Sequence, residues 1–250
     1  MASLVFVSTE LSPYTAGGVG RVLHNVLLAM DPSDRCRTTV VLVDVKVDAV
    51  RFQVDFPGAN LVSVNTQSVD GCRHEDGRIH PPAWAYTDTP QHWRSAVVLR
   101  ALQALAKSTT IAYLEFPDWG ALAFCTLQER LFAGFLSDTR IAVRLHSTHT
   151  VLLNMEAWSV SRQDLSLIDL ERKCLRDCDV LVAQLPSVGE SARKIHGFTP
   201  EEWTPRLRCH APPVLLDHRI PVVRSVPAHG GQPIAFTSKL QRIKRADLFV

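Results

Sequence analysis

Residues 4–30 read LVFVSTELSPYTAGGVGRVLHNVLLAM and contain the first instance of the pattern that decides the fold. The short apolar run at residues 4–8 predicts a buried strand. A loop with two adjacent glycines follows, and apolar residues then recur at helical spacing from Val19 to Met30. A strand followed by a helix is the start of a βαβ unit, so this stretch predicts a parallel sheet with helices packed on it.

The same alternation continues along the first 200 residues. Short apolar runs predict five further strands, at residues 38–45, 60–65, 110–114, 140–145 and 180–184. Most of these runs are apolar nearly throughout, which indicates a sheet that is covered on both faces. Helical spacing recurs from Trp93 to Leu105. The sequence therefore predicts an α/β fold with a Rossmann-like, mostly parallel sheet and helices on both faces.

A further helix is expected at residues 162–177, where a charged pattern alternates with apolar positions. We expect one set of its apolar side chains to face inward, namely Leu165, Ile168, Cys174, Leu175 and Cys178. Burial is the expected role of the two cysteines because a free cysteine behaves as a small hydrophobic residue; the alternative is a metal pair, since the two lie one turn apart on the helix.

Proline and glycine divide the chain into parts. We expect a Rossmann-like domain at residues 1–198, within which residues 71–90 form a long surface loop. Seven prolines between residues 199 and 233 predict a linker or crossing segment without regular structure. Residues 234–250 resemble the first strand and helix of a second domain.

Composition excludes several function classes. The charge balance of 27 basic and 25 acidic residues gives a net charge of +2, which offers little attraction for nucleic acid. The sequence contains no run of about 18 apolar residues, so it predicts no transmembrane segment. The six cysteines lack the spacing of a zinc site, so we expect no metal site and a reducing, cytoplasmic setting. The first residues lack the basic region of a signal peptide.

The glycine-bearing loop is the first candidate site. Gly17 and Gly18 precede a helix start, where free backbone N–H groups and the helix dipole favour a phosphate or a sugar hydroxyl. The alternative is that both glycines serve a turn with positive φ. A dinucleotide fingerprint does not fit, because its third glycine position holds Leu23.

Two more candidate sites follow neighbouring predicted strands. Glu115, Asp118 and Trp119 come after the strand at 110–114, and Arg144 and His146 end the strand at 140–145. We predict that these residues bind substrate because ligands of open α/β sheets lie at the carboxyl ends of strands. Alternatively, Asp118 caps the next helix and His146 is a structural side chain.

A fourth candidate lies late in the chain. Lys239 and Lys244 follow a predicted strand and could hold a diphosphate between them. A solvated basic helix face explains the same spacing.

The order of these motifs resembles the GT-B glycosyltransferases of the glycogen-synthase-like, family 4 type. The resemblance implies two Rossmann-like domains that face each other, of which this chain supplies the amino-terminal, acceptor-side domain. It implies that Gly17 and Gly18 lie near the donor phosphates, that His146 points at the transferred sugar, and that Lys239 and Lys244 neutralise the leaving diphosphate.

The implied reaction transfers a sugar from a nucleoside diphosphate sugar to the hydroxyl of an unknown acceptor, with retention and without a metal or cofactor. Two features depart from the family pattern. Its Gly-Arg-Leu reads Ser238-Lys239-Leu240 here, and its late acidic pair would lie beyond residue 250, in a carboxyl-terminal domain. We therefore expect this chain alone to be inactive. A non-catalytic sugar- or nucleotide-binding module and an NAD(P)-dependent oxidoreductase remain as alternatives.

Overall fold

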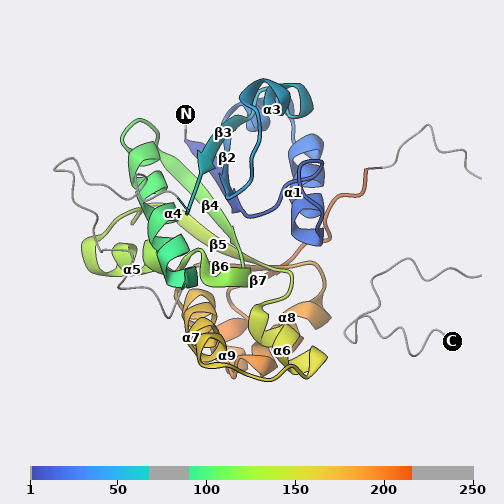
Figure 1. Ribbon diagram of the computed structural model, residues 1–250, viewed down its shortest axis with the longest axis vertical. Helices are drawn as coiled ribbons and strands as arrows, with labels where there is room; N and C mark the ends of the chain where they lie inside the picture. Colours follow the sequence, from blue (N-terminus) through green and yellow to red (C-terminus); the bar gives the residue numbers. More distant parts are fainter. Residues whose placement is uncertain (1, 68–89, 216–250) are drawn as a thin grey trace, which may run out of the picture.

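The computed structural model describes residues 2–67 and 90–215, which form a single sheet of seven strands flanked by helices (Figure 1). Every neighbouring pair of strands is parallel, in the order β3-β2-β1-β4-β5-β6-β7. The strands are β1 (Ser3–Ser8), β2 (Thr38–Val43), β3 (Asn60–Val64), β4 (Ile111–Pro117), β5 (Arg140–Leu145), β6 (Val180–Ala183) and β7 (Leu207–Cys209). The Rossmann-like α/β fold that the sequence predicts is thus confirmed.

The predicted strands differ from the observed ones mainly at their ends. The fourth begins at Ile111 and continues to Pro117, so that it runs past its predicted end and Glu115 lies inside β4. From β1 the chain adds β2 and β3 on one side of the sheet and then returns to add β4 to β7 on the other side, so the order of the strands reverses between β1 and β4. The loops that leave the carboxyl ends of these two strands run to opposite sides, which opens a crevice where ligands of such sheets bind.

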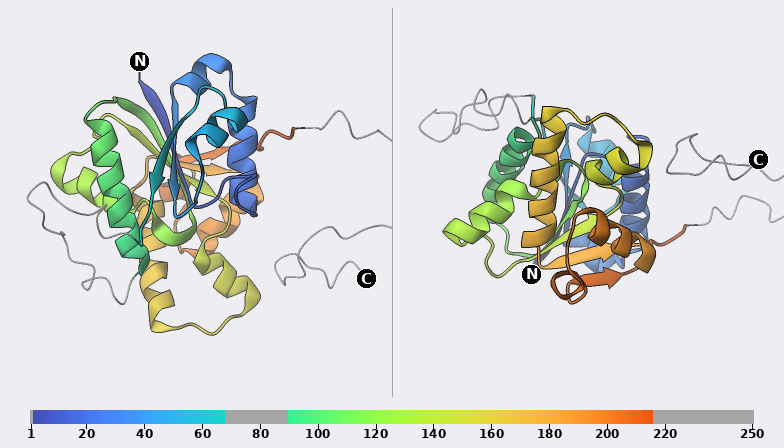
Figure 2. Two further views of the ribbon diagram at one scale, coloured as in Figure 1. Left: turned by 45° about the horizontal axis from the view of Figure 1, so that its top comes forward. Right: turned by 90° about the horizontal axis from the view of Figure 1, so that it is seen from below.

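The helices cover the two faces of the sheet in separate groups, as the views in Figure 2 show. They are α1 (Gly18–Ala29), α2 (Pro32–Cys36), α3 (Ala49–Asp55), α4 (Pro90–Ala106), α5 (Phe124–Ala133), α6 (His149–Glu156), α7 (Arg162–Asp177), α8 (Pro186–Ile195) and α9 (Pro200–Trp203), with a 3₁₀ turn, η3 (Trp119–Ala121). α4, α5 and α7 pack on one face. α1 and α3 pack on the other, over β1 and β2.

α7 occupies the residues that its sequence pattern predicts, and it begins with a capping box between Ser161 and Asp164. Cys174 and Cys178 are buried, as expected. Leu165 is 57% exposed, which contradicts its predicted inward position. The reason is geometric: two residues along a helix turn its surface by about 200°, so that Leu165 lies opposite the buried Leu167.

The segment predicted to lack regular structure begins with a helix and a strand. Thr199 caps α9 with its side chain and pairs with Glu202 in a capping box. Trp203 at the end of α9 is 1% exposed, and Leu207 of β7 pairs with Leu181 of β6. The expectation is therefore wrong for residues 200–209. The prolines were expected to prevent regular structure, but Pro200 occupies the first turn of α9, a position that suits proline.

Several predicted features lie outside the described residues: the loop at residues 71–89, the rest of the predicted linker after residue 215, and the start of a second domain at 234–250. Within the described ranges, no helix is both long and apolar enough to cross a membrane.

Candidate functional site

The carboxyl ends of β1, β4 and β5 meet beneath α1 and enclose a small crevice. Its volume is about 20 Å³. Its lining comprises strand residues and the inner face of α1: Phe6, Val7, Ser8, Val19, Val22, Leu23, Val26, Glu115, Phe116, Pro117, Arg144 and His146. The structure thus brings Glu115, Arg144 and His146 together, although Glu115 and Arg144 are 29 positions apart in the sequence.

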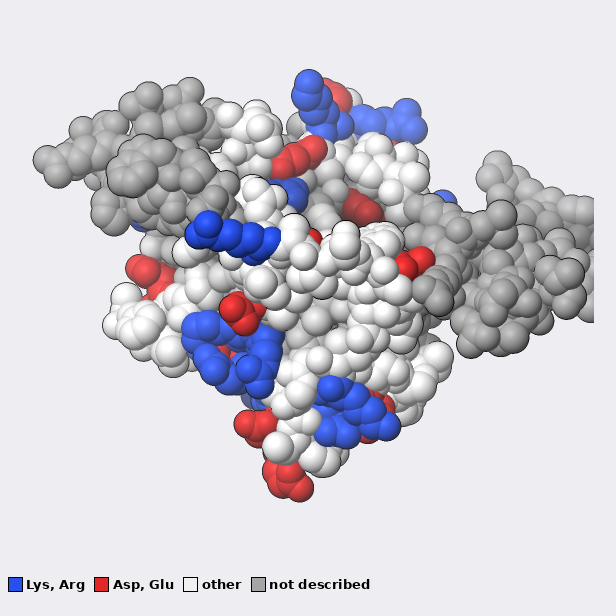
Figure 3. All heavy atoms as spheres, turned by 60° about the horizontal axis from the view of Figure 1, so that its bottom comes forward, with Lys and Arg blue, Asp and Glu red and all other residues white. Residues whose placement is uncertain are grey.

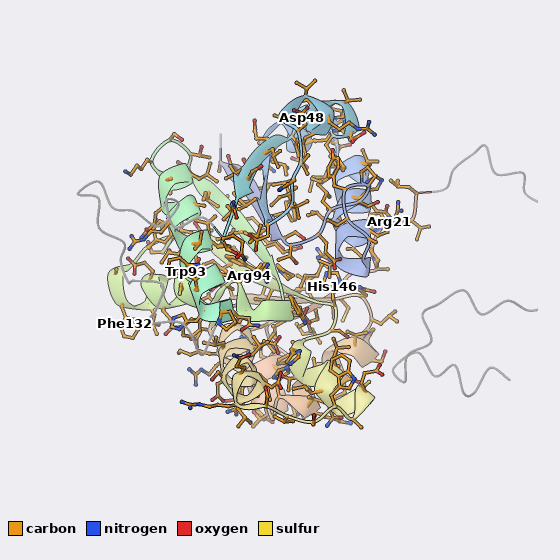
Figure 4. The ribbon with its side chains drawn as sticks, viewed as in Figure 1. Arg21, Asp48, Trp93, Arg94, Phe132 and His146 are labelled. Atoms are coloured by element: carbon orange, nitrogen blue, oxygen red, sulfur yellow. The ribbon has the colours of Figure 1, made fainter. Side chains whose placement is uncertain are left out.

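A larger cavity of about 250 Å³ lies next to this crevice, between α6 and α8. It is lined by Asp118, Leu145, His146, Ser147, Val151, Met155, Ser187, Val188, Ser191 and Ala192. His146 lines both spaces, and Figure 4 shows it between α1 and the layer that contains α6 and α8. A ligand that reaches from the sheet edge into the α6–α8 cavity would therefore pass the imidazole.

The imidazole of His146 is held in a half-buried position at the end of β5. Its Nδ1 atom lies 3.4 Å from Nε2 of Gln184. Burial, together with the nearby positive charge of Arg144, lowers the pKa of His146 to about 4. The ring is accordingly neutral at pH 7, with one nitrogen able to donate a hydrogen bond and the other able to accept one.

Asp118 holds the loop that carries His146. Its carboxylate accepts hydrogen bonds from the backbone N–H groups of His146 at 3.0 Å and Ser147 at 3.4 Å. It makes no side-chain cap to η3, so the alternative that Asp118 caps the next helix is wrong. Burial raises the pKa of Asp118 to about 7, and the charge of Glu171 adds to this shift.

Glu171 is a second buried carboxyl group at this loop and is absent from the site residues that the sequence predicts. It is fully buried on α7 and accepts hydrogen bonds from the backbone N–H groups of Gly120 at 3.2 Å, His149 at 2.8 Å and Thr150 at 3.1 Å. Burial raises its pKa. The available signal was its spacing of one helical turn from Leu167, which places a carboxyl group on the inner face of the helix.

Glu115 and Arg144 form a buried ion pair across β4 and β5. Arg144 donates from Nε to Oε1 of Glu115 at 2.6 Å and from Nη2 to Oε2 at 2.9 Å. The hydroxyl of Tyr113 also donates to Oε2 of Glu115. Each side chain thus has a protein partner within the crevice wall, and their predicted role in substrate binding stays a prediction.

Three glycines lie at the start of α1: Gly17 is its N-cap residue, and Gly18 and Gly20 lie in its first turn. Gly17 and Gly18 are both exposed. A Cβ atom on Gly18 would have open space around it, and its φ is not positive, so the expected backbone constraint at Gly18 is absent. Instead, a Cβ on Gly17 would overlap the Glu10 carboxylate, and one on Gly20 would lie 2.8 Å from the backbone nitrogen of Leu11. The close approach thus occurs on either side of Gly18.

The remaining predicted site residues are not brought to either space by the described structure. Trp119 lies in η3 at intermediate exposure and lines neither the crevice nor the α6–α8 cavity. Lys239 and Lys244 lie outside the described residues. Among residues 2–67 and 90–215, no group of three or more His, Cys, Asp or Glu side chains is arranged to hold a metal ion.

No family model and no curated protein matches the sequence. Several solved structures are similar to it, including the following three. Anabaena Alr3699/HepE, in complex with UDP and glucose, is 12% identical with a TM-score of 0.49, and the match covers 85% of this chain and 44% of that protein. A ugt transferase from Siraitia grosvenorii in complex with UDP is 12% identical with a TM-score of 0.44, over 87% of this chain and 52% of that one.

A further similar structure is Phytolacca americana UGT2 complexed with UDP-2fluoro-glucose and pterostilbene. It is 13% identical with a TM-score of 0.48, and the match covers 87% of this chain and 56% of that protein. This chain therefore spans about half the length of each of these proteins.

Proposed function

We propose that this chain is the amino-terminal, acceptor-side domain of a GT-B glycosyltransferase of the glycogen-synthase-like, family 4 type. The complete enzyme would transfer a sugar from a nucleoside diphosphate sugar to an acceptor hydroxyl, with retention of configuration and without a metal ion or other cofactor. The observation that carries the proposal is the convergence of Glu115, Arg144 and His146 at the crevice below α1.

The arrangement around His146 supports a role in positioning a sugar. An imidazole with a pKa near 4 is a poor proton donor or cation at pH 7 but a good hydrogen-bonding group. The Asp118 and Glu171 carboxyl groups hold backbone N–H groups of the β5–α6 loop and of the start of α6, so the ring is preorganised. Preorganised polar groups at the reacting centre lower the barrier without a cost of rearrangement during the reaction.

The rest of the reaction would need groups on the second domain. When the diphosphate leaves, an oxocarbenium-like sugar and a negatively charged leaving group form, and positive charge is needed beside the phosphates. Under this proposal, Lys239 and Lys244 supply that charge, while Gly17 and Gly18 lie near the phosphates. The acceptor hydroxyl approaches from the α6–α8 cavity and bonds to the sugar carbon beside His146 as the bond from that carbon to the diphosphate oxygen breaks, and the hydroxyl proton passes to the released diphosphate.

The experiment measures nucleoside diphosphate release and sugar transfer by the full-length protein with UDP-, GDP- and ADP-glucose. We expect one donor to be hydrolysed or transferred, and His146→Ala to lower turnover by about 100-fold while the melting temperature changes little. His92→Ala serves as the control, because His92 packs against Phe124 on the far side of the sheet.

Two results would overturn the proposal. One is the failure of the full-length protein to release diphosphate from any of the three donors. The other is normal turnover by His146→Ala together with a large loss of thermal stability, which would make His146 a structural side chain. Binding of NAD(P) without binding of a nucleoside diphosphate would favour an oxidoreductase instead.

A further inference from the structure

The α6–α8 cavity has a chemical character that restricts what it can hold. Five of the side chains that line it are apolar: Leu145, Val151, Met155, Val188 and Ala192. Three are serines, of which Ser187 and Ser191 lie one turn apart on α8 at exposed positions. The remaining two are His146 and Asp118. This is a pocket open to solvent, with a mainly apolar lining, a few hydroxyl groups and an uncharged imidazole at one end.

Among the described residues that line this cavity, none carries a positive charge. Asp118 is the acidic residue of this lining, and its carboxylate is already bonded to the backbone N–H groups of His146 and Ser147. A phosphate or carboxylate ligand would find no cationic partner in this described wall, and burying an unpaired charge is costly. Figure 3 brings the α6 to α9 side forward and shows the Lys and Arg side chains in separate groups with broad uncharged areas between them.

The lining is also poorly suited to a sugar. A sugar ring exposes several hydroxyl groups, each of which loses its water on entering a cavity and needs a protein partner. Within the described part of the chain, the lining offers no Asn, Gln or Arg side chain and no free carboxylate to provide such partners. Val151 and Met155, one turn apart on α6, instead present hydrocarbon and an adaptable thioether to the space.

We infer that the α6–α8 cavity holds a compact, uncharged, apolar alcohol, with its ring among Val151, Met155 and Val188 and its hydroxyl group directed at His146. The volume of about 250 Å³ fits one or two fused rings rather than an oligosaccharide. The assignment of this alcohol as the sugar acceptor rests on the proposed function. The assignment of the cavity as its binding site does not depend on that function.

The test compares three probes by direct titration of the 250-residue chain: 2-naphthol, 2-naphthyl phosphate and methyl α-glucoside. The first two share a ring system and differ in charge, while the third is a sugar. We expect 2-naphthol to bind most tightly and to shift the backbone amide NMR signals of Ser147, Val188 and Ala192. Met155→Glu, which places a charge at the cavity wall, should weaken 2-naphthol binding at least about tenfold.

Leu165→Glu is the matched control, because Leu165 is also exposed but does not line the cavity. It should leave 2-naphthol binding unchanged. The inference is overturned if none of the probes binds, if the phosphate or the glucoside binds more tightly, or if Met155→Glu and Leu165→Glu have equal effects. If 2-naphthol binds in the cavity but the full-length protein transfers no sugar to it or to any other alcohol, the proposed function fails and the assignment of the cavity stands.

Discussion

The carboxylate of Asp118, at the end of β4, accepts a hydrogen bond of 3.0 Å from the backbone N–H of His146, at the end of β5. This contact joins two motifs that lie 28 residues apart and determines where the imidazole stands. Asp118 is therefore a positioning residue: its own oxygen atoms are occupied by the loop, and its effect on a ligand passes through His146.

The raised pKa of Asp118 predicts a dependence of stability on pH. In the folded chain this carboxyl group has a pKa of about 7, compared with an ordinary value of 3.8, so it keeps its proton to a higher pH than in the unfolded chain. Its contribution to the free energy of unfolding is therefore fully present below about pH 4 and declines as the pH rises to about 7. An asparagine side chain at this position has no proton to lose, so the stability advantage of the wild type over Asp118→Asn should shrink across this range.

Thermal melting of both proteins between about pH 4 and pH 7.5 measures this difference. The comparison between variants matters, because His146 and His196, whose pKa values burial lowers to about 4, make the wild type itself more stable as the pH rises from about 4 to 6.5. Both histidines are present in both proteins, so their effect cancels. A difference in melting temperature that stays constant with pH would contradict the assignment of Asp118.

The buried pair of Glu115 and Arg144 predicts a large single-mutant effect. Their side chains are 8% and 14% exposed, so Arg144→Met leaves the Glu115 carboxylate buried without its partner. We expect a loss of about 3–5 kcal/mol in the free energy of unfolding, measured by urea denaturation. The double variant Glu115→Gln, Arg144→Met should recover most of that loss, since no charge is then left unpaired. Additive effects of the two substitutions would argue against a coupled pair.

Gly18 and Gly20 form a matched pair for testing how the first turn of α1 packs against the loop after β1. A Cβ at position 20 would lie 2.8 Å from the backbone nitrogen of Leu11, whereas a Cβ at position 18 meets nothing within 4 Å. Gly20→Ala should therefore lower the free energy of unfolding by about 1–3 kcal/mol through backbone displacement. Gly18→Ala should be neutral or stabilising by up to about 1 kcal/mol, because alanine favours the helix. Equal effects in chemical denaturation would contradict this geometry.

The position of α9 and β7 after α8 predicts how long the chain must be to fold stably. Trp203 is 1% exposed in the core, and β7 adds a seventh strand beside β6. A chain that ends at residue 198 should lose both and melt at a much lower temperature than one that ends at residue 215. Trp203→Ala in the longer chain, which should cost about 3–5 kcal/mol, separates the loss of the side chain from that of the strand. Equal melting temperatures for the two lengths would restore residue 198 as the boundary.

The sequence pattern within a single strand or helix was sufficient to predict some elements. The run at residues 140–145 predicts β5 to the residue, because most of its positions are apolar, as expected of a strand that is covered on both faces. The alternation of charged and apolar residues at 162–177 likewise predicts α7. The prediction that Leu165 faces inward was wrong, because the presence of an apolar residue in a helix does not show which side of the helix faces the core. The sequence pattern failed again at residues 200–209, where burial of Trp203 and pairing with β6 outweigh the dense prolines.

The alternation of strands and helices can be predicted from the residues alone. The edge at which Glu115, Arg144 and His146 gather follows from it, because the carboxyl ends of parallel strands share one side of a sheet. The sequence carried no information on which polar groups would pair. The bonds of Asp118 to the loop at His146, the burial of Glu171 and the apolar cavity between α6 and α8 arise from contacts between residues far apart in the chain. Such contacts depend on how the elements pack in three dimensions, and neither hydrophobic period nor residue spacing encodes them locally.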